Sequence, residues 1–256
     1  MFLVSPERTV AYAEATNDPI PEHRSGELAP PVFAIVPAWE ALVEATTSVV
    51  PPEMLPLLVH GEHDIRIHQP IAPGMRLHTD ASVVGVLPKS SGTSVVVHAV
   101  TRLDDGTPVN EQYLVSFVRA FSVTPSGSPA PGHTFDESAR ATTPRQVTAH
   151  IDDDQTFRYA EASGDPMPIH LDDEVARAVG LPGIIVHGLC TMAFASWACI
   201  SVAGGDPRRL RRLAVRFSRP VLPGQDITTS IWPGQSFETV SSAGDVVIRN
   251  GLAVFG

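Results

Sequence analysis

Runs in which β-branched and other hydrophobic residues alternate with polar ones recur along both halves of the chain, separated by short clusters of turn residues. Such runs predict half-buried strands of antiparallel sheets. The clearest of them are residues 93–103, 112–123, 227–232, 237–240 and 246–255. The Asp104-Asp105-Gly106 sequence and residues 241–244 provide turns between neighbouring strands.

A helical stretch precedes the strands in each half, at Ala38–Val49 and at Gly188–Val202. One helix combined with four or five antiparallel strands predicts an α+β unit. The second stretch lies within residues 182–205, which contain no Asp, Glu, Lys or Arg and are numerous enough to span a bilayer. Because this segment also contains His, Ser, Thr, Gly, Pro and many Ala residues, we expect a buried core helix and no membrane span.

The chain contains an internal repeat, which determines how its fold is organised. Residues 12–23, YAEATNDPIPEH, and residues 159–170, YAEASGDPMPIH, are identical at eight of twelve positions. Further along, RIHQPIAPG at 66–74 matches RFSRPVLPG at 216–224, in the same order. Two matching blocks in one order indicate a duplicated unit.

The join between the two copies is visible in the composition. Residues 124–134, TPSGSPAPGHT, are rich in Pro, Ser and Gly and have no hydrophobic periodicity, as expected of a linker. We therefore place the boundary near residue 130 and predict two units, residues 1–130 and 131–256.

Composition and charge exclude several classes of protein. The net charge of −10 argues against a general nucleic-acid binder, which needs a basic face. Only two cysteines are present, so we expect neither a disulfide framework nor a four-cysteine zinc site. The first residues, MFLVSPERTV, lack the basic and hydrophobic regions of a secretory leader, and we expect a cytoplasmic protein.

Two short segments of the second copy combine residues that can do chemistry. Asp165 and His170 lie five residues apart on a segment stiffened by two prolines, a spacing that can aim a carboxylate and an imidazole at one point. His187 and Gly188 stand at the predicted start of the hydrophobic helix, where free backbone N–H groups suit an oxyanion. A capped turn and a tight helix entry explain these residues equally well on pattern alone.

Residues 157–192, FRYAEASGDPMPIHLDDEVARAVGLPGIIVHGLCTM, resemble the hydratase-2 signature of the MaoC-like (R)-specific enoyl-CoA hydratases and dehydratases. That signature runs Y-A-x-x-S-G-D-x-N-P-[IL]-H-x-D, then G-x-x-x-x-I-V-H-G-M. The repeat extends the resemblance to members that contain two such units. It implies an α+β double hotdog fold, in which antiparallel sheet wraps around a central helix in each unit. The first unit would shape the acyl pocket, and the second would be catalytic.

The resemblance also implies roles for individual residues. Asp165 and His170 correspond to the pair that holds and activates water, and Gly188 to the glycine whose amide binds the thioester oxygen. The resemblance implies further substrate-binding positions at Ser163, Met167 and His187. It implies Ser196 more weakly. Met167 replaces the family's usual Asn, which affects rate or substrate range more than reaction class.

The first copy keeps part of this pattern. Asp18 and His23 have the same five-residue spacing, but Pro37-Ala38 replaces the His-Gly pair, and proline has no N–H to offer. We expect Asp18 and His23 to be structural.

A basic cluster stands out in this acidic chain. It comprises Arg208, Arg209, Arg211, Arg212, Arg216 and Arg219. We expect Arg208, Arg209, Arg211 and Arg212 to bind phosphates of coenzyme A, the alternative being a solvated strand edge. The remaining histidines show no ligand spacing, so no metal is expected.

Together these features predict a hydro-lyase that adds water to trans-2-enoyl thioesters of coenzyme A, or catalyses the reverse, without a cofactor. A dehydratase acting on acyl carrier protein, a non-catalytic acyl-thioester binding protein and, less in keeping with the motif, a thioesterase are the alternatives. We expect a homodimer of double-hotdog chains, with an acyl thioester as the binding partner rather than nucleic acid or membrane.

Overall fold

The computed structural model describes residues 1–256 and has one antiparallel sheet that runs through both halves of the chain. The strands of the first half are β1 (Phe2–Leu3), β2 (Leu58–Ile67), β3 (Arg76–Lys89), β4 (Gly92–Leu103), β5 (Pro108–Arg119) and β6 (Ser126–Gly127). Those of the second half are β7 (Arg145–His150), β8 (Leu210–Phe217), β9 (Asp226–Ile231), β10 (Ser236–Ser241) and β11 (Val246–Phe255). The strand order is β1-β3-β4-β5-β2-β8-β11-β10-β9-β7, with β6 paired to β3.

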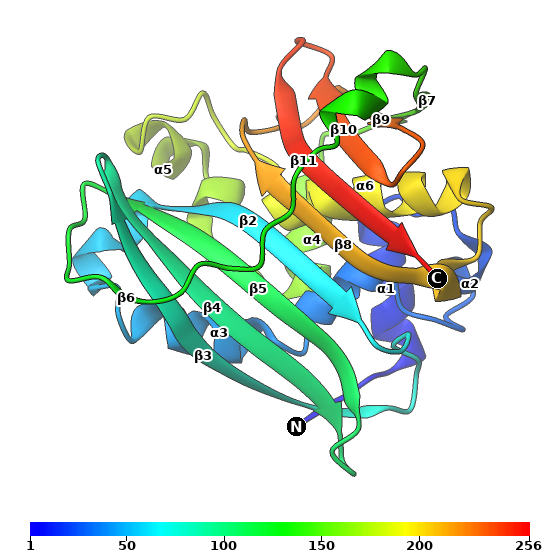
Figure 1. Ribbon diagram of the computed structural model, residues 1–256, viewed down its shortest axis with the longest axis horizontal. Coiled ribbons are helices and arrows are strands. Elements are labelled where there is room, and N and C mark those ends of the chain that lie inside the picture. The colour runs from blue at the N-terminus through cyan, green and yellow to red at the C-terminus, as the bar shows by residue number, and fades with distance from the viewer.

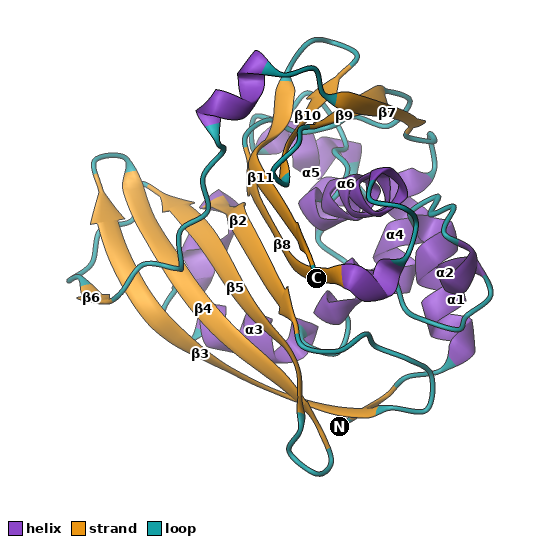
Figure 2. Cartoon of the chain, turned by 45° about the vertical axis from the view of Figure 1, so that its right-hand side comes forward, coloured by secondary structure: helices purple, strands orange, loops and turns teal.

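The helices lie on the concave side of this curved sheet (Figure 2). They are α1 (Pro6–Ala15), α2 (Pro21–Arg24), α3 (Trp39–Thr47), α4 (Gln155–Ser163), α5 (Asp173–Ala178) and α6 (Gly188–Val202). Helices α3 and α6 follow the two copies of the repeated motif. Sheet wrapped around one such helix in each half is the α+β double hotdog predicted from the sequence.

The predicted strands and the two principal helices are confirmed, with ends that shift by a few residues. Helix α6 is buried from Leu189 to Ile200, which explains why its segment carries no charge. No helix combines the length and the hydrophobicity that crossing a membrane would require. Helix α3 is shorter, and Val43 and Glu44 on it are exposed.

The two half-sheets join where β2 pairs with β8, in register from Glu62 opposite Arg216 to Arg66 opposite Arg212. The connection from β5 to β7, which contains the predicted boundary near residue 130, crosses the outer face of the sheet (Figure 1). Its close fit depends on glycine: a side chain on Gly85 would meet the Ser128 carbonyl oxygen at 2.1 Å.

Behind the sheet, α1 and α4 carry the repeated YAEA sequence and pack together. Tyr12 and Tyr159, at the same position of the two copies, are fully buried and join their hydroxyl groups at 3.0 Å. One hydrophobic core runs through both units around this contact. The two copies therefore form a single folded body.

Candidate active site

The catalytic loop predicted from the sequence, residues 164–170, begins where α4 ends. Gly164 closes the helix in the left-handed conformation, with φ of +79°, which favours glycine. The Asp165 amide donates a hydrogen bond to Ser163 Oγ at 3.2 Å, and the Met167 amide donates to Asp165 Oδ1 at 3.1 Å. Ser163 thus helps to hold the loop. The Asp165 carboxyl group is held in place by the Met167 amide of the same loop.

His170 ends the short helical turn η4 (Pro168–His170) and is buried. Its Nδ1 lies 2.8 Å from the carbonyl oxygen of Ile185. Because a carbonyl oxygen only accepts, this ring nitrogen donates its proton, and Nε2 of the neutral ring keeps a free lone pair. Burial lowers the pKa of His170 to about 4, so the neutral form is the one present near pH 7.

His187 stacks on His170, with ring centroids 3.7 Å apart. Thr156 connects the two histidines, because its hydroxyl lies 2.9 Å from the His170 carbonyl oxygen and 3.2 Å from His187 Nδ1. Burial, followed by the neighbouring His170, lowers the pKa of His187 to about 2. Thr156 is a positioning residue that the sequence analysis missed.

Asp165 completes the cluster, with Oδ2 4.0 Å from His187 Nε2. Burial raises the pKa of its carboxyl group to about 6. Asp165, His170 and His187 each offer one atom that could ligate a metal ion, and these atoms lie within 4.8 Å of one another. The same spacing that suits a bound water would also suit a metal ion, a possibility that sequence spacing did not indicate.

Gly188 is the first residue of α6, and its amide makes no hydrogen bond within the protein. A side chain there would approach the Phe217 ring to 3.3 Å. The matching residue of the first copy, Ala38, donates its amide to the Ile35 carbonyl at 3.1 Å. Only the second copy therefore presents a free N–H at this helix start.

These groups open into a cavity of about 440 Å³. The second unit contributes Asp165, Met167, His170, His187 and Gly188 to its wall. The first unit contributes residues of α3 and of strands β2 and β5, among them Trp39, Leu42, Val43, Leu58, His60, Leu114 and Ser116. The sequence analysis missed these first-unit residues, because no motif marks them.

Two expectations about substrate binding are not met by the geometry. Ser196 is buried in α6 and does not line the cavity.

The four arginines expected to bind phosphates also lie away from the cavity. Phe217, at one end of β8, lines the cavity, whereas Arg211 and Arg212 lie towards the other end, about 20 Å and about 17 Å away at roughly 3.3 Å per residue. Arg208 and Arg209 lie in the short turn that precedes the strand. The guanidinium groups of all these arginines are occupied within the protein, by Glu22, Glu27 and Asp206 for Arg208, by backbone carbonyls for Arg209 and Arg211, and by Asp64 for Arg212.

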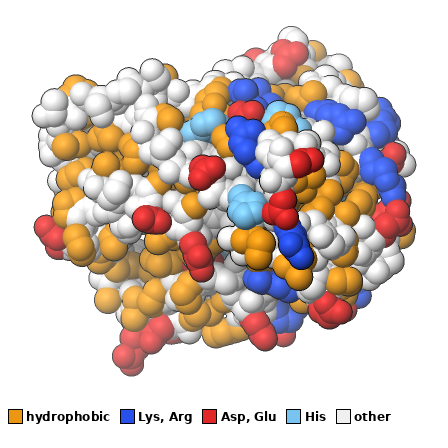
Figure 3. Space-filling view, turned by 90° about the horizontal axis from the view of Figure 1, so that it is seen from below, with side chains coloured by type: hydrophobic (Ala, Val, Ile, Leu, Met, Phe, Trp, Pro, Cys, Tyr) orange, Lys and Arg blue, Asp and Glu red, His pale blue; other side chains and the backbone are white.

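On the face shown in Figure 3, the basic side chains lie mainly on the right-hand side, with acidic side chains beside them. Arg219 is the one member of the basic cluster that lines the cavity. Arg219 belongs to the repeated RFSRPVLPG block, and this repeat is the feature of the sequence that could have pointed to it.

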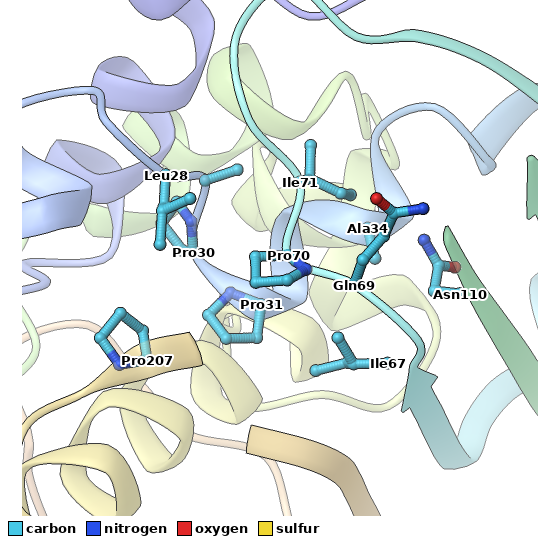
Figure 4. A pocket seen from close by; sticks show the side chains of 11 residues that line it. Leu28, Pro30, Pro31, Ala34, Ile67, Gln69, Pro70, Ile71, Asn110 and Pro207 are labelled. Carbon is cyan, nitrogen blue, oxygen red and sulfur yellow. The ribbon is translucent and has the colours of Figure 1, made fainter. Parts of the chain in front are cut away.

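The first unit has a small pocket at the position that matches the catalytic cavity (Figure 4). Gln69, Pro70 and Ile71 line it, as Arg219, Pro220 and Val221 line the cavity. Its volume is about 20 Å³, enough for little more than one water molecule. Asp18 and His23 do not reach it and are joined to each other by a buried 2.8 Å hydrogen bond.

Comparisons with known proteins agree with this arrangement. A family model described as "MaoC like domain" matches residues 131–252, and one described as "MFE-2 hydratase 2 N-terminal domain" matches residues 22–120. The chain is 29% identical to mouse peroxisomal multifunctional enzyme type 2 over 234 residues, which are 86% of this chain. It spans only 31% of that enzyme's length.

A second relative is the 3-hydroxyacyl-thioester dehydratase Y of Mycobacterium tuberculosis, 29% identical over 73% of this chain and 67% of the relative. Among solved structures, a MaoC-like dehydratase from Phytophthora capsici superposes with a TM-score of 0.88. The match covers 99% of this chain and 92% of that one, at 24% identity, and therefore bears on the fold.

Proposed function

Since the chain belongs to the MaoC-like dehydratase and MFE-2 hydratase 2 family, whose members act on acyl thioesters, we propose that it reversibly hydrates trans-2-enoyl thioesters of coenzyme A to (3R)-hydroxyacyl thioesters. One observation carries this proposal. The free Nε2 of His170, the Asp165 carboxyl group and the free Gly188 N–H line the same cavity.

A water molecule between Asp165 and His170 supplies the oxygen. Two hydrogen-bond acceptors, the carboxylate and His170 Nε2, orient it towards the β-carbon of the enoyl group. As the carbon–oxygen bond forms, the electrons of the double bond move onto the thioester oxygen. The Gly188 N–H, at the positive end of the α6 dipole, stabilises the negative charge that develops there.

The proton of the attacking water moves to Asp165. We assign the proton to Asp165 because burial raises the pKa of its carboxyl group and lowers the pKa of the His170 imidazolium. The resulting carboxylic acid then delivers that proton to the α-carbon, and the thioester carbonyl re-forms. Asp165 thus acts as base and then as acid, while His170 positions the water.

The two-unit cavity supports an acyl thioester as the substrate. Its first-unit wall is mostly hydrophobic, as an acyl tail requires, while the reacting groups come from the second unit. Arg219 and Arg119, the two arginines that line the cavity, are placed to meet the negatively charged part of coenzyme A.

The direct test is to mix the protein with crotonyl-CoA and follow loss of the enoyl-thioester absorbance. Hydration with formation of 3-hydroxybutyryl-CoA supports the proposal, and chiral analysis of the product checks the (3R) configuration. Release of free coenzyme A would indicate a thioesterase. Binding without turnover of short or long enoyl-CoA would indicate a non-catalytic acyl-thioester protein. Turnover only of substrates attached to acyl carrier protein would show that the carrier protein, and not coenzyme A, carries the acyl group.

A further inference from the structure

A row of buried polar side chains crosses the inner face of the first-unit sheet. His60 Nε2 lies 3.2 Å from His63 Nδ1, and His63 Nε2 lies 3.1 Å from Gln112 Oε1. The Gln112 amide nitrogen donates to the Ala34 carbonyl at 2.8 Å and to Asn110 Oδ1 at 3.0 Å. Asn110 borders the small pocket of Figure 4 and His60 lines the catalytic cavity, so the row connects the two.

The donor of each hydrogen bond in the row can be assigned by starting from the Ala34 carbonyl. The Ala34 carbonyl only accepts, so the Gln112 nitrogen faces it and Gln112 Oε1 faces His63. His63 Nε2 therefore carries a proton. Burial lowers the pKa of His63 to about 4, so the ring is neutral and its Nδ1 is an acceptor.

His60 must then donate through Nε2. Burial, followed by the neighbouring His63, holds the pKa of His60 well below its usual range, so this ring is neutral as well. Its remaining nitrogen, Nδ1, therefore keeps a lone pair. The row thus fixes His60 as a hydrogen-bond acceptor in the cavity wall.

Ser116 provides a second polar group beside it. His60 and Ser116 are directly opposite each other in the β2–β5 pair, and both line the catalytic cavity. Ser116 is only 2% exposed, and its hydroxyl has no hydrogen-bond partner in the protein. Opposite residues on one face of a sheet lie close enough to contact one ligand group together.

The position of this pair relative to the reacting atoms is defined by one aromatic ring. The His60 ring packs against Phe217 at a centroid distance of 4.9 Å, and Phe217 lies against Gly188. Phe217 thus contacts His60 and also lies beside Gly188, and the pair shares the cavity wall with Trp39 and Leu42 of the first unit.

A purely hydrocarbon tail would leave both polar groups without partners when it displaced water from them. A hydroxyl group on the tail can donate to His60 Nδ1 and accept from Ser116. Building on the hydratase function, we propose that His60 and Ser116 make this site selective for enoyl thioesters whose acyl tail carries a hydroxyl group.

The test compares trans-2-octenoyl-CoA with four analogues that each carry one hydroxyl group, on carbon 5, 6, 7 or 8. We expect at least one analogue to have a kcat/KM roughly threefold to tenfold above that of the parent, the range of one neutral hydrogen bond. His60→Leu should abolish that ratio, and Ser116→Ala should reduce it. His98→Leu is the matched control, because His98 stacks on Tyr113 and does not line the cavity.

The parent substrate separates this inference from the function on which it rests. If the parent is hydrated but every hydroxylated analogue is slower, or if His60→Leu leaves the ratio unchanged, the selectivity is refuted and the hydratase function stands. If neither parent nor analogue is hydrated, both fall. Independently of any variant, ¹⁵N NMR of the ring nitrogens should find the His60 proton on Nε2, and a proton on Nδ1 would overturn the argument.

Discussion

Burial acts in opposite directions on the two side chains of the catalytic loop, because it disfavours whichever form is charged. It raises the pKa of Asp165 to about 6 and lowers that of His170 to about 4. Neither residue has a close partner of opposite charge. The first-unit pair differs, because Asp18 and His23 bond directly to each other. An Asp and a His that hydrogen-bond directly to each other serve a structural role, whereas a pair kept apart can bind a water molecule between them.

Replacing Asp165 with Asn should separate activity from stability. We expect turnover to fall by on the order of a hundredfold or more, since the proton carrier is lost. Stability should rise by roughly 1–3 kcal/mol at neutral pH, because a buried carboxylate that burial disfavours becomes a neutral amide. Thermal melts and initial rates on the same preparations measure both. A variant that keeps near-normal activity would refute the assigned role.

The pH dependence of that stability gain has a definite sign. The pKa of Asp165 is higher in the folded protein, about 6, than the ordinary value of 3.8, so the folded state binds the extra proton between these values. The wild type therefore loses stability as pH rises through 6, and the Asn variant's advantage should vanish below about pH 4.

Activity should follow the same carboxyl group. If Asp165 must be ionised to accept the water proton, kcat/KM rises as pH increases through about 6 and falls about tenfold per unit below it. A pH profile with a non-titrating substrate analogue as control measures this. A flat profile down to pH 4 would transfer the role of base to His170.

Met167 is the residue where the catalytic loop departs from its family. Its side chain is 41% exposed and lines the cavity. A thioether packs against hydrophobic tails but cannot hold the loop by hydrogen bonds. We expect Met167→Asn to raise kcat/KM for crotonyl-CoA more than for a long enoyl-CoA. An equal decrease for both substrates would show that the methionine serves packing alone.

At the scale of elements, the junction between β2 and β8 gives the predicted phosphate-binding arginines a different function. Arg212 donates two hydrogen bonds, of 2.9 and 2.8 Å, to the buried Asp64 carboxylate on the neighbouring strand. The same guanidinium reaches the Gly132 carbonyl at 3.2 Å. Arg212 therefore fastens both the two half-sheets and the connection that crosses them.

Arg212→Ala should destabilise the protein by about 3 kcal/mol, because the buried Asp64 carboxylate loses both hydrogen bonds from Arg212 and keeps only Arg66, whose Nε lies 3.9 Å away. Arg208→Ala, at an exposed site, should have a much smaller effect on the free energy of unfolding, because solvent screens exposed ion pairs. Denaturant unfolding of the two variants measures the difference. Neither should change KM for a coenzyme A thioester, and a raised KM in either would restore the phosphate-binding interpretation.

Elements and motif residues could be predicted because their signals are local. Alternation identified the strands, the absence of charge identified α6, and the resemblance to the hydratase-2 signature identified Asp165, His170 and Gly188. The cavity wall could not be predicted in this way. His60 and Ser116 meet the catalytic residues only through strand pairing between distant segments, and the partners of Arg212 depend on the register of β2 against β8.

At the scale of the whole molecule, two copies of one unit contain one working cavity. The second-unit site opens to about 440 Å³, whereas its first-unit counterpart keeps about 20 Å³. Helix α3 contributes residues along its whole length to the wall of the large cavity, from Trp39 to Thr47, whereas α6 contributes only residues of its first turn, from Gly188 to Thr191. Both copies are therefore needed for one site.

The asymmetry predicts how variants of the first copy behave. Asp18→Asn should lower stability by roughly 1–3 kcal/mol, because it weakens a buried hydrogen bond to His23, while kcat changes less than about twofold. Calorimetry and saturation kinetics distinguish the two effects. A loss of kcat comparable to that of Asp165→Asn would instead mean that the first copy takes part in catalysis.

The Tyr12–Tyr159 contact makes the two halves resemble the subunits of a symmetric dimer. In such a dimer a residue meets its own counterpart on the two-fold axis, as these two equivalent tyrosines meet here. Because both halves belong to one chain, their sequences can differ, and one pocket can be small where the other is wide.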